Sequence, residues 1–275
     1  MNKYNIISTI FSCWLLLFLY QQAICTTAQV SDEDEGEFEY SKKSPRGPEH
    51  WGSLREEWAK CGNSTVRWQS PIDIVNSTVK AVSDGGQLMF NYKSANATVH
   101  NSGHDIEIEW IGDAGSAQFK GVNYSLVQCH WHSPAEHLID GKRYDLELHM
   151  VHVNSSDMAA LVVSQLYQIS DSPDPFLSQF KAQIKSLTKT VGDVPMAGVV
   201  DPRSARTDTA IKYYNYLGSL TTPSCNGTVI WIVNETISTV AEKQVDLLSE
   251  AVFDYAEMNA RPVQPLNGRE ILLYH

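Results

Sequence analysis

The sequence predicts a mainly β single domain with a few peripheral helices, and three observations carry that prediction. Apolar and polar residues alternate in short stretches at residues 87–92, 97–102, 105–110, 126–132, 145–153, 159–167 and 228–233. Such alternation is typical of half-buried strands. Helical patterns occur at only two places, and no linker rich in glycine, serine or proline divides the chain after residue 37. We therefore expect one domain over residues 38–275.

The two helical patterns cover residues 174–189 and residues 239–253. Pro175 stands near the start of the first pattern, where proline is well tolerated. Thr239 is followed three residues later by Glu242, which is the signature of a capping box. We therefore predict one helix in each segment, with the second beginning at Thr239.

The N-terminal residues 1–25 have the features of a signal peptide. A single positive residue, Lys3, precedes an apolar run over residues 6–20 and a short segment ending at Cys25. The alternative is a membrane anchor, but this run is shorter than the roughly 20 residues that a bilayer span needs. Residues 26–37 are acidic and without periodicity, so we expect a mobile leader there.

Glycosylation sequons support a secretory route. Seven Asn-x-Ser/Thr triplets lie outside the predicted signal peptide, and we take all seven as candidate glycosylation sites at surface positions: Asn63, Asn76, Asn96, Asn123, Asn154, Asn226 and Asn234. The expected destination is extracellular, in a plant the apoplast, with the vacuole or a plastid reached through the secretory route as alternatives.

The net charge is strongly negative. It is −11 for the whole chain, and removal of residues 1–25 takes away one lysine and no acid, which gives −12. An acidic protein repels phosphates, so neither nucleic acid nor an anionic membrane is an expected partner. The sequence does not decide between monomer and dimer.

Three cysteines remain after removal of the signal peptide, which in an oxidising compartment predicts one disulfide and one free thiol. Cys61 and Cys225 each lie beside a sequon, in segments expected at the surface. Cys129 lies within an apolar alternation and is expected in the core. The predicted disulfide therefore joins Cys61 with Cys225.

The stretch "LVQCHWHSPAEH" and the next predicted strand bring histidines together. On a strand, successive side chains point to opposite faces. Gln128, His130 and His132 therefore share one face, and Cys129 points to the other. In "DLELHMVHV" Glu147, His149 and Val151 share a face in the same way, whereas His152 points to the other. Each face thus carries a hydrogen-bonding residue two positions before a histidine.

This pattern predicts a zinc site made of His130, His132 and His149. Three neutral imidazoles leave one tetrahedral position open for water, and the other ring nitrogen of each ligand needs a fixed partner. His137 and His152 are interpreted as structural histidines. A cupin-type site would use His132 and Glu136 as ligands instead, but the second cupin motif is missing downstream.

The chain resembles the α-class carbonic anhydrases, and in particular the secreted plant members, from Phe38 to His275. The resemblance rests on a series of motifs in order: "GPEHW", "QSPIDI", "NSGHDI", "QCHWHSPAEH", "DLELHMVHVN", "YYNYLGSLTTPSC", "VIWIV" and "NARPVQPLNGR". It implies a single domain around a twisted, mostly antiparallel sheet of about ten strands, with short helices outside and zinc at the base of a cleft.

The resemblance also implies roles for individual residues. Zinc is ligated by His130, His132 and His149, and these ligands are held by Gln128, Glu147 and the main chain near Asn259. Thr221 orients zinc-bound hydroxide and donates its own proton to Glu136, while His104 carries the released proton out with help from Tyr40 and Asn101. By their positions in the family motifs, the residues implied to surround the substrate are Thr221, Thr222, Val151, Val162, Leu220, Val229 and Trp231.

The implied activity is reversible hydration of carbon dioxide to bicarbonate and a proton by attack of zinc-bound hydroxide. The alternative is a storage or defence glycoprotein on the same fold with weak or no catalysis, because plant members of that kind exist. Such proteins often lose a ligand or an orienting residue, whereas here His130, His132, His149, Thr221 and Glu136 are all present. The sequence also departs from the family near the expected proton path, where Glu107 adds a negative charge.

Overall fold

The computed structural model describes residues 37–62, 68–83, 88–188, 194–205, 207, 212–252 and 258–275. They lie within one compact unit, Glu35–His275. The predicted signal peptide and the leader up to residue 36 lie outside the described residues, and so does the sequon at Asn63. None of the helices in the described part is long and apolar enough to cross a membrane.

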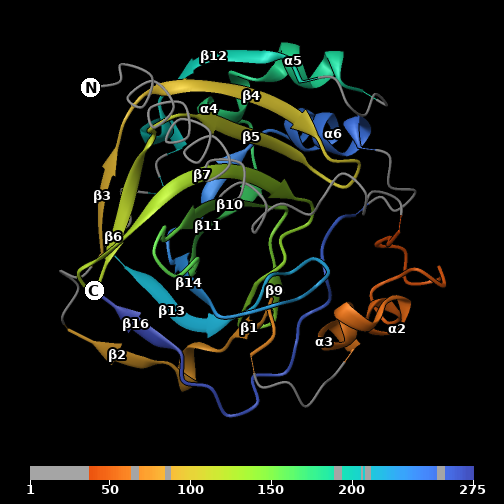
Figure 1. Ribbon diagram of the computed structural model, residues 1–275, viewed down its shortest axis with the longest axis vertical. Coiled ribbons are helices and arrows are strands. Elements are labelled where there is room, and N and C mark those ends of the chain that lie inside the picture. Colours follow the sequence, from red (N-terminus) through yellow and green to blue (C-terminus); the bar gives the residue numbers. More distant parts are fainter. Residues whose placement is uncertain are drawn as a thin grey trace, which may run out of the picture. The chain divides into compact units, whose positions relative to one another are not determined.

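The described part of the chain is built around a sheet of 13 strands, whose main path Figure 1 labels from β12 at one edge to β2 at the other. Along this path the strands are β12 (Met196–Val200), β4 (Ala95–Asn101), β5 (Ile106–Ile111), β7 (Val122–His132), β10 (Leu146–Val153), β11 (Ala160–Ile169), β14 (Val229–Asn234), β13 (Tyr213–Gly218), β16 (Leu272–Tyr274) and β2 (Lys80–Val82). Off the path, β15 (Ser238–Val240) pairs with β11, and β3 (Leu88–Tyr92) pairs with β6 (Gly115–Phe119), which pairs with β7. A second sheet contains β1 (Asp73–Ile74), β8 (Leu138–Ile139) and β9 (Lys142–Arg143).

The prediction of a mainly β fold is confirmed. Each of the seven alternating stretches lies on a strand of the large sheet, namely β3, β4, β5, β7, β10, β11 and β14. The sheet is larger than the expected ten strands and is mixed. Most neighbours are antiparallel, whereas β11 runs parallel to β14 and β15, and β16 runs parallel to β2.

The helices are short, as expected, but the boundaries differ from the prediction. The first pattern forms two helices, α4 (Pro175–Ser178) and α5 (Lys181–Ser186), rather than one. The second forms α6 (Glu242–Ala251), which begins after Ala241 instead of Thr239 because the chain from Ser238 to Val240 pairs with β11 as β15. The other helical segments are α2 (Trp51–Leu54), η2 (Glu56–Trp58), α3 (Ala59–Gly62), η3 (Asn76–Thr78) and η5 (Pro202–Ala205).

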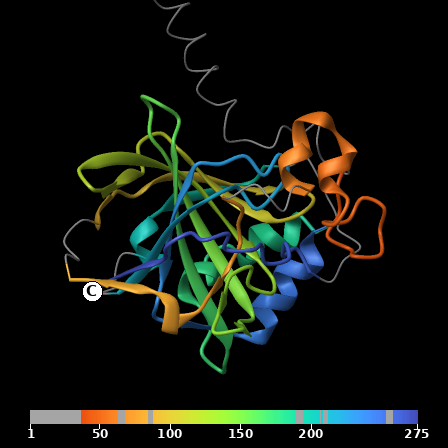
Figure 2. The ribbon, with the colours of Figure 1, turned by 90° about the horizontal axis from the view of Figure 1, so that it is seen from below.

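The central strands are buried on both faces. One face packs against the helices through a core that includes Phe176 of α4, Ile184 of α5 and Leu248 of α6. In Figure 2, α6 is the blue helix beside the sheet. The other face carries a separate apolar cluster that includes Val162 and Trp231. The residues of "DLELHMVHV" therefore lie between two apolar layers, and polar side chains there need internal partners.

Asp174 caps α4 and gives a pH-dependent contribution to stability. Its Oδ1 accepts the Leu177 N–H at 2.7 Å, and burial raises its pKa from 3.8 to about 6 despite that bond. The folded state therefore binds the proton more tightly than the unfolded state. Stability from this group is complete below pH 3.8 and is lost as the pH rises through 6.

We expect Asp174→Asn to be more stable than the parent by about 3 kcal/mol at pH 8, because asparagine caps equally well without a buried charge. Near pH 4 the two proteins should differ little. Urea unfolding of both proteins across this range measures the difference. A difference that stays constant with pH would contradict the role of Asp174.

The sequons fall into two groups in the structure. Asn76, Asn96, Asn123 and Asn226 are exposed and Asn154 is half-buried. Asn234 is only 1% exposed, and its Nδ2 donates to Gln165 Oε1 at 3.0 Å and to the Thr207 carbonyl at 3.2 Å. The prediction of a surface glycosylation site is therefore wrong for Asn234, because β14 places this side chain in the interior, where a glycan has no room.

Candidate metal centre

The centre lies where β7 and β10 run antiparallel beside each other. The register pairs His149 directly with His130 and pairs Glu147 with His132, so the three histidines predicted from the alternation share one face. One nitrogen from each of His130, His132 and His149 lies within 4.8 Å of the others. His149 Nδ1 and His130 Nε2 are 3.3 Å apart. The structure thus brings the three predicted ligands together.

The second ring nitrogen of each histidine has a partner at hydrogen-bonding distance. These contacts are His130 Nδ1 to Gln128 Oε1 at 2.9 Å, His132 Nδ1 to the Asn259 carbonyl at 2.7 Å, and His149 Nε2 to Glu147 Oε1 at 2.8 Å. A ring nitrogen that donates its proton outward leaves the other nitrogen with a lone pair facing inward. The three inward nitrogens therefore form a set of donors suited to a metal ion.

Electrostatics favour neutral rings at two of the three positions. Burial and the neighbouring rings of His132 and His149 hold the pKa of His130 well below its ordinary value. Burial also lowers the pKa of His149. For His132 burial acts in the same direction, but the Glu136 and Asp105 carboxylates outweigh it and raise the pKa.

The residues fit a zinc ion. His132 Nε2 is fully buried and has no hydrogen-bond partner among the described residues, which is costly for a polar atom that nothing binds. Neutral imidazole nitrogen is a preferred zinc donor, and a three-histidine set leaves one coordination position open. The zinc prediction therefore agrees with the donors present.

Glu147 is the centre of a buried hydrogen-bond network. Besides His149, its carboxylate contacts His137 Nδ1 at 2.6 Å and accepts from Ser164 Oγ at 2.6 Å. It also accepts the main-chain N–H groups of Glu136 and His137. Burial alone would raise the pKa of Glu147, but His137 and His149 outweigh it and hold the pKa well below its ordinary value. The acceptor behind His149 is thus a carboxylate fixed by several donors.

His137 and His152 both have structural partners. His137 Nε2 lies 2.6 Å from the Tyr216 hydroxyl, which in turn lies 2.8 Å from Ser70 Oγ. His152 Nε2 lies 2.9 Å from the Tyr92 hydroxyl. Neither histidine belongs to the group formed by His130, His132 and His149.

Glu136 lies beside the histidines with one free carboxylate oxygen. Its Oε1 accepts the main-chain N–H of Arg261 at 2.9 Å. Its Oε2 is 3.6 Å from His132 Nε2 and has no hydrogen-bond partner among the described residues. Thr221 is buried on the loop after β13, and among the described residues its hydroxyl does not form the expected hydrogen bond to Glu136.

The expected substrate wall forms one apolar cluster. Val151, Val162, Val229 and Trp231 are buried members of it, and Leu220 packs against it. The Trp231 ring lies edge-on to the His149 ring, with 4.9 Å between the ring centroids. Thr222 is half-buried on the adjoining loop. An apolar cluster therefore lies directly beside one of the three candidate ligand rings.

His104 is buried among aromatic side chains. It is 8% exposed, and its ring stacks on Phe38 with 4.1 Å between centroids. Tyr40 approaches edge-on, with 6.0 Å between centroids. The His104 carbonyl accepts from Asn259 Nδ2 at 2.9 Å. The residue that supports His132 thus also holds the His104 loop.

The prediction that Asn101 helps a proton path is wrong. Asn101 is fully buried, because the alternation of β4 places it on the core face with Ala97 and Val99. Its Nδ2 donates to the carbonyls of Leu187 and Ala251, and its Oδ1 accepts the Gly103 N–H. Asn101 therefore braces the loop that carries His104.

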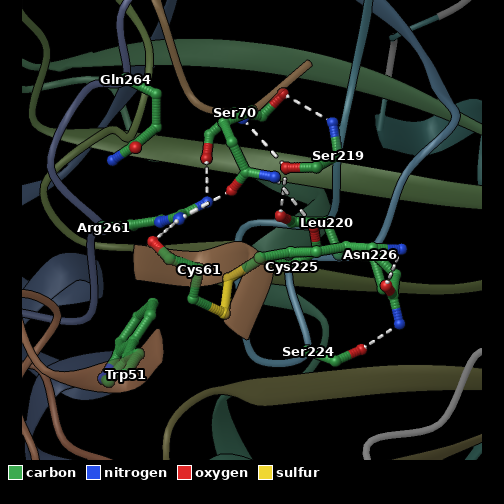
Figure 3. The surroundings of a disulfide bond; sticks show 12 residues. Trp51, Cys61, Ser70, Ser219, Leu220, Ser224, Cys225, Asn226, Arg261 and Gln264 are labelled. Atoms are coloured by element: carbon green, nitrogen blue, oxygen red, sulfur yellow. Dashed lines mark hydrogen bonds between the residues drawn. A yellow bond between two sulfur atoms is a disulfide. The ribbon is translucent and has the colours of Figure 1, made fainter. Parts of the chain in front are cut away.

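The predicted disulfide Cys61–Cys225 is present, and Figure 3 shows its surroundings. Arg261 Nη2 donates to the Cys61 carbonyl at 3.0 Å, and Gln69 Nε2 donates to the Cys225 carbonyl at 3.0 Å. Burial lowers the pKa of Arg261 to about 10, which still leaves it charged near neutral pH. Cys129 is a free, fully buried cysteine in the helix-side core, as predicted.

The sequence did not predict the contacts of two residues near the centre: Arg261 was not singled out, and Glu107 was noted only as a charge near the proton path. Arg261 joins Glu136 to the disulfide segment through its main chain and side chain. Glu107 lies on β5 directly opposite His130. Arg261 stands within "NARPVQPLNGR", yet its partners are distant in the chain. The register of β5 with β7 is the signal that would have placed Glu107.

Comparisons with known proteins agree with this architecture. The family described as eukaryotic-type carbonic anhydrase matches residues 46–275. A carbonic anhydrase of Nesocodon mauritianus is 44% identical over 277 residues, covering 100% of this chain and 98% of that protein. A crystal structure of dioscorin complexed with ascorbate has a TM-score of 0.82 and 39% identity, covering 86% of this chain and 98% of the other. An α-carbonic anhydrase from Thermovibrio ammonificans in complex with sulfanilamide has a TM-score of 0.75 and 31% identity, covering 86% and 98% of the two chains. The chain belongs to the eukaryotic-type carbonic anhydrase family.

Proposed function

We propose that the protein is a zinc lyase that hydrates carbon dioxide reversibly to bicarbonate and a proton. The observation that supports it is the convergence of His130, His132 and His149, each with an outward partner. Zinc held by three imidazoles lowers the pKa of a bound water to about 7, which supplies a nucleophile at neutral pH.

The chain's own groups hold the substrate and orient the nucleophile. The apolar cluster around Trp231 and Val162 suits a linear, uncharged molecule and excludes large polar ones. The Thr221 hydroxyl accepts a hydrogen bond from the nucleophile, because its own proton is directed to Glu136. Among the described residues Glu136 Oε2 has no hydrogen-bond partner, and we propose it as the acceptor for the Thr221 proton. This pairing of acceptors and donors fixes which lone pair faces the substrate.

His104 carries the proton of each turnover toward solvent. Histidine is the side chain that ordinarily titrates near neutral pH, and this one lies on the loop held by Asn259 beside the centre. Tyr40 and Phe38 limit the positions of its ring.

We expect His104→Ala to lower kcat about 10-fold in weakly buffered solution, because general acid–base transfer contributes factors of this order or more. Imidazole buffer should restore much of the loss, since it can accept the proton instead. Stopped-flow hydration with and without imidazole measures both. Unchanged turnover in weak buffer would remove His104 from the mechanism.

The proposed activity is tested on protein secreted from a eukaryotic host. Zinc is quantified per chain, and carbon dioxide hydration is followed with and without a sulfonamide. We expect about one zinc per chain and sulfonamide-sensitive hydration. Stoichiometric zinc without hydration would overturn the proposed enzymatic activity. Absence of zinc from protein that was refolded or expressed with zinc would overturn the proposed zinc site.

The second candidate is a storage or defence glycoprotein with weak or no catalysis. It is favoured by the resemblance to dioscorin, whose structure is among the similar ones. The zinc-binding and orienting residues present here favour the enzyme over this candidate. The hydration assay separates the two.

We further propose that residues 1–25 direct the chain into the secretory pathway and that an acidic leader precedes a domain over residues 38–275. The disulfide and the exposed sequons at Asn76, Asn96, Asn123 and Asn226 support an oxidising, glycosylating compartment. The extracellular space is the proposed destination.

A further inference from the structure

Glu107 lies on β5 next to the candidate metal centre, and its contacts there suggest a role other than that of a charge near the proton path. It is the direct partner of His130 in the β5–β7 register. Its Oε1 accepts from Gln128 Nε2 at 2.8 Å, and Gln128 Oε1 lies 2.9 Å from His130 Nδ1. A chain of two hydrogen bonds therefore runs from the Glu107 carboxylate to a ring that faces the metal site.

The three histidines differ in how firmly their partners fix the proton. His132 faces a main-chain carbonyl and His149 faces a carboxylate. Both are acceptors only, so each forces the facing ring nitrogen to carry the proton. His130 faces the side chain of Gln128, whose amide can present either an oxygen or an NH₂ group to the ring. Gln128 alone therefore leaves the tautomer of His130 undetermined.

The contact with Glu107 removes this ambiguity. Glu107 Oε1 accepts from Gln128 Nε2, so Gln128 turns its NH₂ group toward β5 and its oxygen toward β7. The oxygen then requires a proton on His130 Nδ1, and His130 Nε2 keeps its lone pair for the metal. With Glu107 included, all three rings are held by an acceptor that has no alternative orientation.

We propose that Glu107 is a positioning residue that acts through Gln128 to fix the tautomer of the zinc ligand His130. This inference rests on the proposed function only for the identity of the metal. The tautomer itself is a property of the metal-free protein.

Glu109 provides a matched control on the same strand. It lies two residues further along β5, is half-buried on the same face and is the register partner of Gln128. The hydrogen bond to Gln128 Nε2 nevertheless comes from Glu107. Glu109→Gln therefore removes one negative charge close to the centre without removing that bond.

The first test is zinc affinity by competition with a chelator. We expect Glu107→Gln to weaken zinc binding about 10-fold, in line with other residues that hold a metal ligand from behind. Glu109→Gln should stay within about twofold of the parent. In a Gln128→Ala background, Glu107→Gln should add nothing, because the residue acts through Gln128. Two results would overturn the proposal: an equal loss of zinc affinity in Glu107→Gln and Glu109→Gln, or a loss from Glu107→Gln that persists in the Gln128→Ala background. Either would mean that Glu107 acts only as a nearby negative charge.

The second test is independent of metal binding. The ¹⁵N resonances of the His130 ring in the metal-free protein, at mildly alkaline pH, report which nitrogen carries the proton. We expect a single Nδ1–H tautomer in the parent and in Glu109→Gln, and a mixture in Glu107→Gln. The same tautomer in all three proteins would overturn the proposal even if zinc affinity changed. A parent protein that binds no zinc would contradict the proposed function and leave this test of Glu107 intact.

Discussion

Replacing His132 with alanine is expected to abolish stoichiometric zinc binding and carbon dioxide hydration together. Structural zinc sites with four ligands bind with about 10 to 16 kcal/mol, so an equal share is about 3 kcal/mol per ligand. Loss of one ligand should therefore weaken binding by roughly 100-fold or more. Alanine also leaves the Asn259 carbonyl without its 2.7 Å partner, which loosens the segment that holds His104. Zinc content by mass spectrometry and initial hydration rates measure the two losses.

Cys129→Ala is the control for this prediction. Cysteine is a good zinc ligand by type, and Cys129 lies next to His130 in the chain. It is nevertheless fully buried in the helix-side core, so its replacement should leave zinc content unchanged and lower stability by about 1 kcal/mol. Stoichiometric zinc in His132→Ala, or loss of zinc in Cys129→Ala, would contradict the assignment of the ligands.

Strand alternation predicted the part of the fold that holds the metal centre. In β7 and β10 the two faces meet different environments, and the residue pattern records that difference. The alternation does not predict the irregularity at Val127. There the register of β7 with β10 shifts, since Val151 pairs with Gln128 but His152 pairs with Leu126. The sequence therefore predicted which side chains of these two strands converge.

Other strands gave no such signal. β13 is buried at almost every position and reads "YYNYLG", so it shows no alternation even though it lies within the large sheet. The edge strand β12 contains Gly198 at a register shift and has mostly exposed side chains. Strands whose two faces carry the same kind of side chain lack a period of two in polarity, which is why the sheet is larger than predicted.

Contacts between distant segments account for what the sequence missed at the site. Asn259 holds His132 through its carbonyl and the His104 segment through its side chain, across more than a hundred residues of chain. Glu107 meets Gln128 only because β5 and β7 are neighbours in the sheet. The prediction for Asn101 came from the resemblance of its motif to the family's proton-path segment. The alternation of β4 instead places its side chain in the core. For Asn101 the physical pattern was the better guide.

Removing the disulfide with Cys61→Ala and Cys225→Ala is expected to lower the free energy of unfolding by about 3 to 5 kcal/mol. The bond closes a loop over a sequence separation of 164, and crosslinks over long loops restrict the unfolded chain most in the chain-entropy description. Urea unfolding of the double variant, compared with the parent, measures the change. Reduction of the parent under native conditions should give a similar loss. A loss below about 1 kcal/mol in both experiments would contradict this role.

The same change is expected to lower kcat while leaving zinc content unchanged. The Cys225 N–H donates to the Thr222 carbonyl at 2.7 Å, and the Leu220 N–H donates to the Asn226 carbonyl at 2.8 Å. The disulfide therefore anchors the turn that contains Thr221 and Thr222.

The three histidines, in contrast, stand on β7 and β10 and are held by the sheet register. Loss of the anchor should thus misplace the groups that orient the nucleophile and dock the substrate without disturbing the ligands. Hydration kinetics and zinc analysis on the same folded sample, with Cys129→Ala as a cysteine control, separate the two effects. Zinc loss in step with activity would instead mean that the disulfide supports the whole centre.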